Sequence, residues 1–295
     1  ISRNTMTDNP QLSLIIPVYN DPAGIKQTLQ SLVRQKNALD YEVIVVDNDS
    51  TDKTSRVIKE FEENYPEFVS GHSETEIQGS YAARNTGIEH ASGDLLAFID
   101  ADVTVEETWV ADVHEIFQNS DVDYLGCNVE MYIPDGENTF WARYDVAMGL
   151  PVEYYLETKQ FAPTCALVVR REVVNDVGLF EESLISGGDK EFGKRVHNAG
   201  FTIDYSSQLV VRHPVRPTFR EHISKAKRIG IGQYQLWQQY DLAQHPLCPL
   251  RLIPPNPVRI ANRSTNSSRI LLVYIIAYFL KIVQAVSSIR IYIRD

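Results

Sequence analysis

Short apolar runs alternate with amphipathic segments along the first hundred residues. Three of these runs are uninterrupted and rich in branched side chains, which is typical of strands buried on both faces. They predict strands over residues 12–18, 42–46 and 95–99. The segments between them carry apolar residues at helical spacing and begin with residues that cap helices, such as Asp21 and Ser50. This alternation predicts an α/β fold, a mainly parallel sheet flanked by helices.

The pattern is less regular in the second half of the chain. It predicts strands over 124–132 and 166–169, and helices over 189–198 and 218–240. The aromatic-rich stretch 141–155 can either line a pocket or pack in the core.

The C-terminal part differs in composition from the rest. Five prolines within 246–257, followed by a polar and basic stretch, predict a linker over 241–269. Residues 270–280 are all apolar, and Lys281 then interrupts the run. A spanning helix needs about 20 apolar residues, so this segment is borderline. We expect 270–295 to be a membrane-associating tail that lies in the interface, although a helix packed on the protein or on a second subunit stays open.

These patterns predict four parts. Residues 1–11 are polar, and we expect them to be disordered or foreign to the domain. A catalytic domain would cover 12–240, with a ligand-binding half at 12–103 and a second half at 104–240. The linker and the tail follow it.

Charge is distributed unevenly along the chain. The net charge of −11 argues against a general nucleic-acid binder. From His245 to the end the charge is +6, whereas the first 244 residues carry −17. A cationic, apolar tail suits an anionic membrane surface. The three cysteines are far apart in sequence, and we expect buried thiols in a reducing compartment rather than disulfides or a zinc site.

Polar clusters follow each of the three predicted buried strands. They are Tyr19-Asn20, Asp47-Asn48-Asp49 and Asp100-Ala101-Asp102. Parallel sheets bind ligands at the carboxyl ends of their strands, so these clusters predict one ligand-binding rim. The pair Asp100 and Asp102 offers hard oxygen ligands of the kind that suit Mg²⁺ or Mn²⁺ bound to a diphosphate. A third Asp-x-Asp, at 121–123, precedes its strand and so lies at the opposite end.

Four segments in order resemble one known family. They are SLIIPVYND (13–21), VIVVDNDSTD (43–52), AARNTGIEHASGDLLAFIDAD (82–102) and VGLFEESLISGGDKEFGKRVHNAG (177–200). Over about residues 12–235 the chain resembles family 2 glycosyltransferases with the A-type, Rossmann-like nucleotide-diphospho-sugar transferase fold.

The resemblance implies a role for each matching residue. Asp102 would bind the metal, with help from His213, and Asp189 would be the catalytic base. The donor-binding residues would be Pro17, Val18, Tyr19, Asn48, Arg84, Asn85, Asp100, Ala101 and Arg228. Many relatives have an acidic residue at the position of Asn48, which leaves the base open. Taken alone, Asp189 could cap a helix, His213 could make a structural hydrogen bond, and Arg228 could lie on a solvated face.

The resemblance therefore implies an inverting, Mn²⁺- or Mg²⁺-dependent glycosyltransferase that uses a nucleotide-diphosphate sugar, with UDP as the first choice. With the tail it suggests a lipid-linked saccharide or glycolipid acceptor and a location at the cytoplasmic face of the membrane. An inactive nucleotide-sugar-binding or membrane-scaffold protein is one alternative. A sugar nucleotidyltransferase is another, but it would need a glycine-rich basic loop after the first strand.

Overall fold

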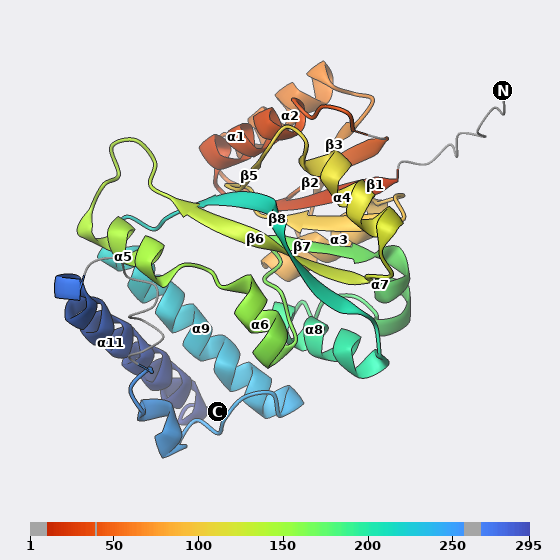
Figure 1. Ribbon diagram of the computed structural model, residues 1–295. Helices are drawn as coiled ribbons and strands as arrows, with labels where there is room; N and C mark the ends of the chain where they lie inside the picture. The colour runs from red at the N-terminus through yellow and green to blue at the C-terminus, as the bar shows by residue number, and fades with distance from the viewer. Residues whose placement is uncertain (1–10, 39, 257–266) are drawn as a thin grey trace, which may run out of the picture. The chain divides into compact units, whose positions relative to one another are not determined.

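The computed structural model describes residues 11–38, 40–256 and 267–295. Eight strands form one sheet in the order β3-β2-β1-β4-β7-β6-β8-β5 (Figure 1). The strands are β1 (Leu12–Val18), β2 (Tyr41–Asp47), β3 (Val69–Ser73), β4 (Leu95–Ile99), β5 (Thr104–Val105), β6 (Tyr124–Tyr132), β7 (Ala166–Arg170) and β8 (Ile203–Pro214). The helices are α1 (Pro22–Leu32), α2 (Thr54–Asn64), α3 (Ser80–His90), α4 (Trp109–Asn119), α5 (Phe140–Met148), α6 (Val152–Lys159), α7 (Arg171–Val177), α8 (Gly188–Ala199), α9 (Phe219–Tyr240) and α11 (Ser267–Tyr292), with a 3₁₀ turn η1 (Pro249–Leu252).

The three predicted apolar strands are confirmed as the buried centre of the sheet. Every residue of β1 and β4 is buried, as are the last five of β2. Strand β1 pairs in parallel with both β2 and β4, and β2 pairs in parallel with β3. Val18 lies opposite Asp47, and Asp47 lies opposite Ser73. The carboxyl ends of these strands therefore meet at one edge, as the sequence predicts.

The second half of the sheet is antiparallel. Strand β7 pairs antiparallel with β4 and β6, and β5 pairs antiparallel with β8. The predicted α/β fold is confirmed, but the sheet is mixed, since three of the six pairings described are antiparallel. A strand buried on both faces is a continuous apolar run whichever way it points, so the sequence pattern could not give its direction.

The chain forms two compact units. The first contains the residues up to Val129, Pro151–Glu182 and Phe192–Arg212, and the second contains Glu130–Leu150, Ser183–Glu191 and the residues from His213 onward. The predicted boundaries at residues 103 and 240 stay predictions. Residues 1–10 of the predicted N-terminal segment and 257–266 of the predicted linker lie outside the described residues.

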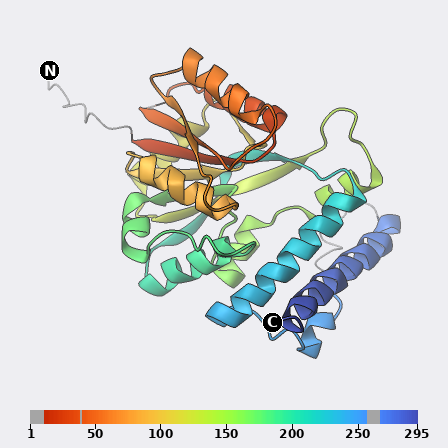
Figure 2. The same cartoon turned by 180° about the vertical axis from the view of Figure 1, so that it is seen from behind.

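Helices α9 and α11 dominate the second unit, and they lie side by side and run in the same direction (Figures 1 and 2). Tyr144 of α5, Ala226 of α9, and Val273 and Leu280 of α11 form a buried apolar cluster. The two helices approach each other closely at Gly230. A Cβ at that position would lie 2.3 Å from the backbone oxygen of Gln284. Only glycine allows this approach without movement of the backbone.

We expect Gly230→Ala to lower the free energy of unfolding by about 1–3 kcal/mol, because overpacking against a backbone atom forces the helices apart. This loss would exceed the gain of about 1 kcal/mol in helix propensity from alanine. Chemical denaturation measures it. Gly79→Ala is the matched control, because its Cβ would meet only the backbone oxygen of Glu182, at 3.8 Å. Equal losses in the two variants would contradict the close approach.

Candidate active site

The turn after β4 holds Asp100, Ala101 and Asp102. The buried Thr28 hydroxyl on α1 lies 2.8 Å from the carbonyl oxygen of Ala101 and 2.7 Å from that of Val103, and shares its proton between them. The Val103 amide donates to the Asp100 carbonyl over 3.1 Å and closes the turn. Both carboxylates are half-buried. The turn therefore presents two acidic side chains from a fixed backbone.

A buried arginine contacts the first of these carboxylates. Arg84 on α3 is only 3% exposed, and its guanidinium donates to Asp100 Oδ1 over 2.6 Å and to the Ser80 carbonyl over 3.2 Å. The Asp100 side chain is 37% exposed. A buried cation is stable only when it is paired, so Asp100 compensates Arg84 and one of its oxygens is engaged. The structure thus brings together two of the predicted donor-binding residues.

Asn48 is buried and its amide is fully engaged. It donates to the carbonyls of Glu74 and Ile77, over 3.0 and 2.9 Å. Its Oδ1 accepts from the Gln78 side chain and from the Gly79 backbone N–H, over 3.0 and 2.7 Å. These four bonds hold the loop between β3 and α3. The predicted contact with the nucleotide base stays a prediction.

The loop that Asn48 holds also has an internal anchor. Glu74 Oε1 accepts from the backbone N–H of Ile77 and Glu76, and Oε2 accepts from the Thr86 hydroxyl. The bond from the Ile77 N–H, with that from Thr86, lowers the pKa of Glu74. The carboxylate is therefore ionised at neutral pH, and the loop is fixed at both ends.

Asn85 is engaged in a similar way. Its side chain donates to the Phe180 carbonyl over 2.8 Å and accepts from the Phe180 N–H over 3.0 Å. Both residues are buried. This pair of bonds ties α3 to the segment after α7. In this structure the Asn85 amide binds backbone, and its predicted place near the donor stays a prediction.

The end of β1 combines buried and exposed residues. Pro17 and Val18 are buried, whereas Tyr19 is 52% exposed. The Asn20 side chain accepts from the Thr51 N–H over 2.8 Å, so the loops after β1 and β2 are joined. Tyr19 therefore presents an aromatic ring at the predicted rim.

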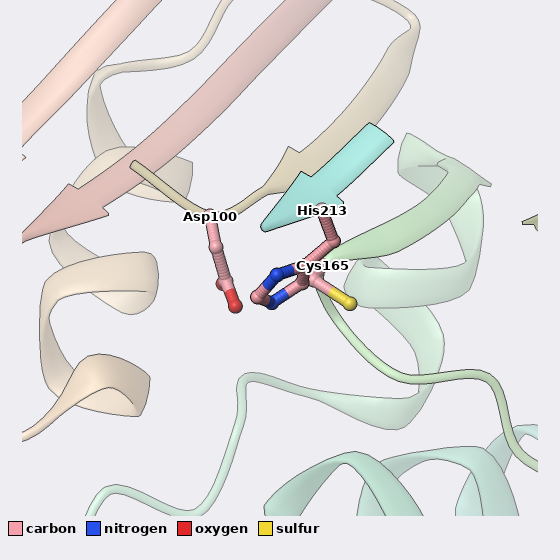
Figure 3. A group of neighbouring side chains, drawn as sticks. All are labelled: Asp100, Cys165 and His213. Carbon is pink, nitrogen blue, oxygen red and sulfur yellow. The ribbon is translucent and has the colours of Figure 1, made fainter. Parts of the chain in front are cut away.

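Cys165 contributes to the neighbourhood of Asp100, although the sequence predicted only buried thiols. Its sulfur lies within 4.8 Å of a carboxylate oxygen of Asp100, and Figure 3 shows both side chains. His213 is buried on β8, next to Arg212, which pairs with Thr104 just after the Asp102 turn. Its Nδ1 lies 2.8 Å from the carbonyl oxygen of Pro214. The structural hydrogen bond left open by the sequence is therefore present.

Asp189 and Arg228 belong to the second unit. Asp189 is the second residue of α8 and half-buried, and its Oδ1 accepts from the Lys190 N–H over 2.9 Å. Gly187, with φ of 92°, makes the turn before the helix, which favours glycine. Arg228 is exposed on α9. Both predicted roles stay predictions.

Two residues of the site have no recognisable signal in the sequence. Thr28 is one apolar-face position among several in an amphipathic helix, and Cys165 precedes a strand without any motif around it. Both contact the Asp100-Ala101-Asp102 turn, which is more than sixty positions away from each of them in the sequence. No local pattern could have shown them.

Comparisons with known proteins agree on one family. Residues 13–178 match the description "Glycosyl transferase family 2". The chain is 40% identical to "Glycosyltransferase AglE" of Haloferax volcanii over 229 residues, which cover 77% of this chain and 74% of that protein. It is 28% identical to "Pre-mycofactocin glycosyltransferase" of Mycobacterium tuberculosis over 74% of this chain, but over only 46% of that relative.

Solved structures agree on the fold. The mannosyltransferase PcManGT from Pyrobaculum calidifontis, in complex with GDP-Man and Mn²⁺, superimposes with a TM-score of 0.67 at 19% identity, over 96% of this chain and 88% of that one. S. aureus TarS 1-349 in complex with UDP-GlcNAc gives a TM-score of 0.58 at 17% identity, over 94% of this chain and 89% of that one. Because the family match spans more than half of the residues, the chain belongs to glycosyl transferase family 2 and is a glycosyltransferase.

Proposed function

We propose that this enzyme transfers a sugar, with inversion, from a nucleotide-diphosphate sugar to an acceptor hydroxyl. The observation that carries the proposal is the fixed Asp100-Ala101-Asp102 turn at the carboxyl end of a central strand. Neighbours of the same fold are described in complex with GDP-Man, UDP or UDP-GlcNAc. UDP is the first donor nucleotide to test, and GDP is the second.

The donor set of the turn fits a divalent metal. Carboxylate oxygens are the ligands that Mg²⁺ and Mn²⁺ prefer, and imidazole also suits Mn²⁺. Asp102 would hold the ion, with His213 as a second ligand. When bound, such an ion stabilises the negative charge that develops on the leaving diphosphate. The Cys165 thiol is a softer ligand, so Mn²⁺ is the better candidate of the two.

The protein would hold the donor at the rim. Pro17, Val18 and Tyr19 would lie against the base and ribose, and the exposed ring of Tyr19 supports this role. Asp100 and Ala101 would contact the ribose or sugar. Arg84, itself buried, would act by holding Asp100.

The remaining donor contacts are less direct. Arg228 would reach the diphosphate. Asn48 and Asn85 would act by holding the loops around the nucleotide, because their amides already bind protein backbone. This is the role that we propose for them in place of a direct contact.

Asp189 would act as the base. The acceptor oxygen forms a bond to the anomeric carbon while the bond from that carbon to the diphosphate oxygen breaks. The electron pair leaves with the nucleotide, and the acceptor proton passes to the Asp189 carboxylate. Attack from the face opposite the leaving group inverts the anomeric carbon. A positioned base of this kind contributes about 10²–10⁴-fold to the rate.

The acceptor that we propose is a lipid-linked saccharide or glycolipid, met at the cytoplasmic face of a membrane. Helix α11 supports this, because Ile270–Tyr292 is long and apolar enough to cross a bilayer, and only 17% of its most apolar stretch is buried. A purified enzyme that glycosylates soluble acceptors but never lipid-linked ones would overturn this part.

Asp189→Asn should lower kcat by about 10²–10⁴-fold and leave the donor dissociation constant within twofold, because the amide cannot accept the proton. Asp102→Ala should instead abolish the Mn²⁺-dependent part of donor binding. Calorimetric titration of UDP and GDP sugars, with and without Mn²⁺, measures binding. Asp112→Asn, on the surface helix α4, is the control and should behave as wild type. Wild-type protein that binds no nucleotide would sink the proposal.

Asn48→Asp should weaken UDP and GDP by a similar factor, because the carboxylate cannot donate to the Glu74 and Ile77 carbonyls and the loop loses two bonds. We expect a loss of unfolding free energy of about 1–3 kcal/mol. Titration of UDP and GDP against the wild type and the variant measures the affinities, and chemical denaturation measures the unfolding free energy.

The control for this variant is Asn119→Asp, where an exposed amide donates to a single helix carbonyl. It should change neither stability nor affinity appreciably. A reversed preference between UDP and GDP in Asn48→Asp would show that Asn48 reads the base directly.

A further inference from the structure

The second unit exposes an apolar surface of unusual length. On α11 the exposed large apolar side chains are Leu271, Leu272, Ile275, Phe279 and Val286, which are between 44% and 68% exposed. Four of them, Leu271, Ile275, Phe279 and Val286, are separated by four or seven residues, so they fall on one face of the helix, and Leu272 lies at the edge of that face. Soluble proteins rarely leave a continuous apolar strip of this length in water, and such strips mark interaction surfaces.

The 3₁₀ turn η1 extends this strip. The Tyr278 hydroxyl donates to the carbonyl of Leu252, and Lys281 Nζ donates to that of Ile253. Leu252 and Ile253 are themselves 47% and 51% exposed. Leu252 and Ile253, which are far from α11 in the sequence, thus add exposed apolar side chains beside this helix.

The opposite face of α11 is committed to the protein. Gly230 of α9 contacts the backbone at Gln284. Arg251 donates to the buried Ser288 hydroxyl over 2.9 Å, and the Tyr234 hydroxyl donates to Asp295 over 2.6 Å. The neighbouring α9 carries basic residues in its first half, namely Arg220, Lys225, Lys227 and Arg228, and several glutamines in its second half. A helix fixed to such a partner cannot cross the hydrocarbon core without carrying those charges into it.

Charge favours one occupant of the surface. From His213 to the end the chain has twelve basic and three acidic residues. Arg290 on α11 and Arg294 just after the helix are both exposed. A second copy docked there would bring these like charges together. An anionic lipid surface would instead attract them, while the apolar strip enters the acyl boundary.

We propose that α11 and η1 form an in-plane docking surface for an anionic lipid bilayer, with α11 kept on α9. The inference deepens the membrane location proposed above. It does not rest on glycosyl transfer itself, because it concerns binding to lipid in the absence of donor and acceptor.

Co-sedimentation of the full chain with vesicles tests the proposal. The vesicles are phosphatidylcholine alone, or phosphatidylcholine with phosphatidylglycerol. We expect binding to the mixed vesicles, at least tenfold weaker binding to the neutral ones, and release by alkaline carbonate. Ile275→Asp should weaken binding to the mixed vesicles at least tenfold, and Leu271→Asp should do the same as a second, independent variant. Leu179→Asp, an equally drastic change at an exposed apolar residue of the first unit, should leave binding unchanged.

Several results would overturn the proposal. Equal binding to neutral and anionic vesicles would show that lipid charge does not contribute to binding. Resistance to carbonate extraction would show a spanning helix. Absence of vesicle binding, with a lipid-free dimer that Ile275→Asp dissociates, would assign the surface to a second copy.

Discussion

The parallel pairing of β1 with β2 and β4 is the constraint on which the rest of the candidate site depends. Parallel strands in register end together, so three polar clusters separated by some thirty to fifty residues arrive at one edge. The pairing requires the strands to be apolar on both faces, since helices cover them. The same apolar runs therefore stabilise the core and position the acidic turn. A change in strand pairing would therefore alter both the stability of the core and the geometry of the candidate ligand-binding edge.

Around that edge, buried polar side chains form hydrogen bonds and an ion pair with other parts of the protein. Arg84 is paired with Asp100, Asn48 with the loop before α3, and Asn85 with Phe180. Buried polar side chains held by such bonds make a rigid frame. A preorganised site of this kind does not have to break water contacts or reorient groups when a ligand arrives.

The sequence predicted the buried strands, the helices α1, α2, α3, α8 and α9, and the acidic turn, because each has a local signature. Its limits have physical causes. Strand β3 has the sequence VSGHS, which is short and mostly polar, and it was not predicted because its pairing with β2 alone makes it a strand. The antiparallel direction of β7 leaves no mark on an apolar run. Cys165 and Thr28 reach the turn through contacts between distant segments, which composition and periodicity do not encode.

The parallel run of α9 and α11 also has a topological consequence. A chain that leaves one helix at its C-terminal end must travel back along the whole helix before it can enter a parallel neighbour. Twenty-two residues of α9 correspond to about 33 Å. The described part of that return path lies beside the C-terminal half of α11, since Arg251 binds Ser288 and Ile253 binds Lys281. A parallel pair of helices inside one unit thus requires a return connection, as a pair of parallel strands does in a βαβ motif.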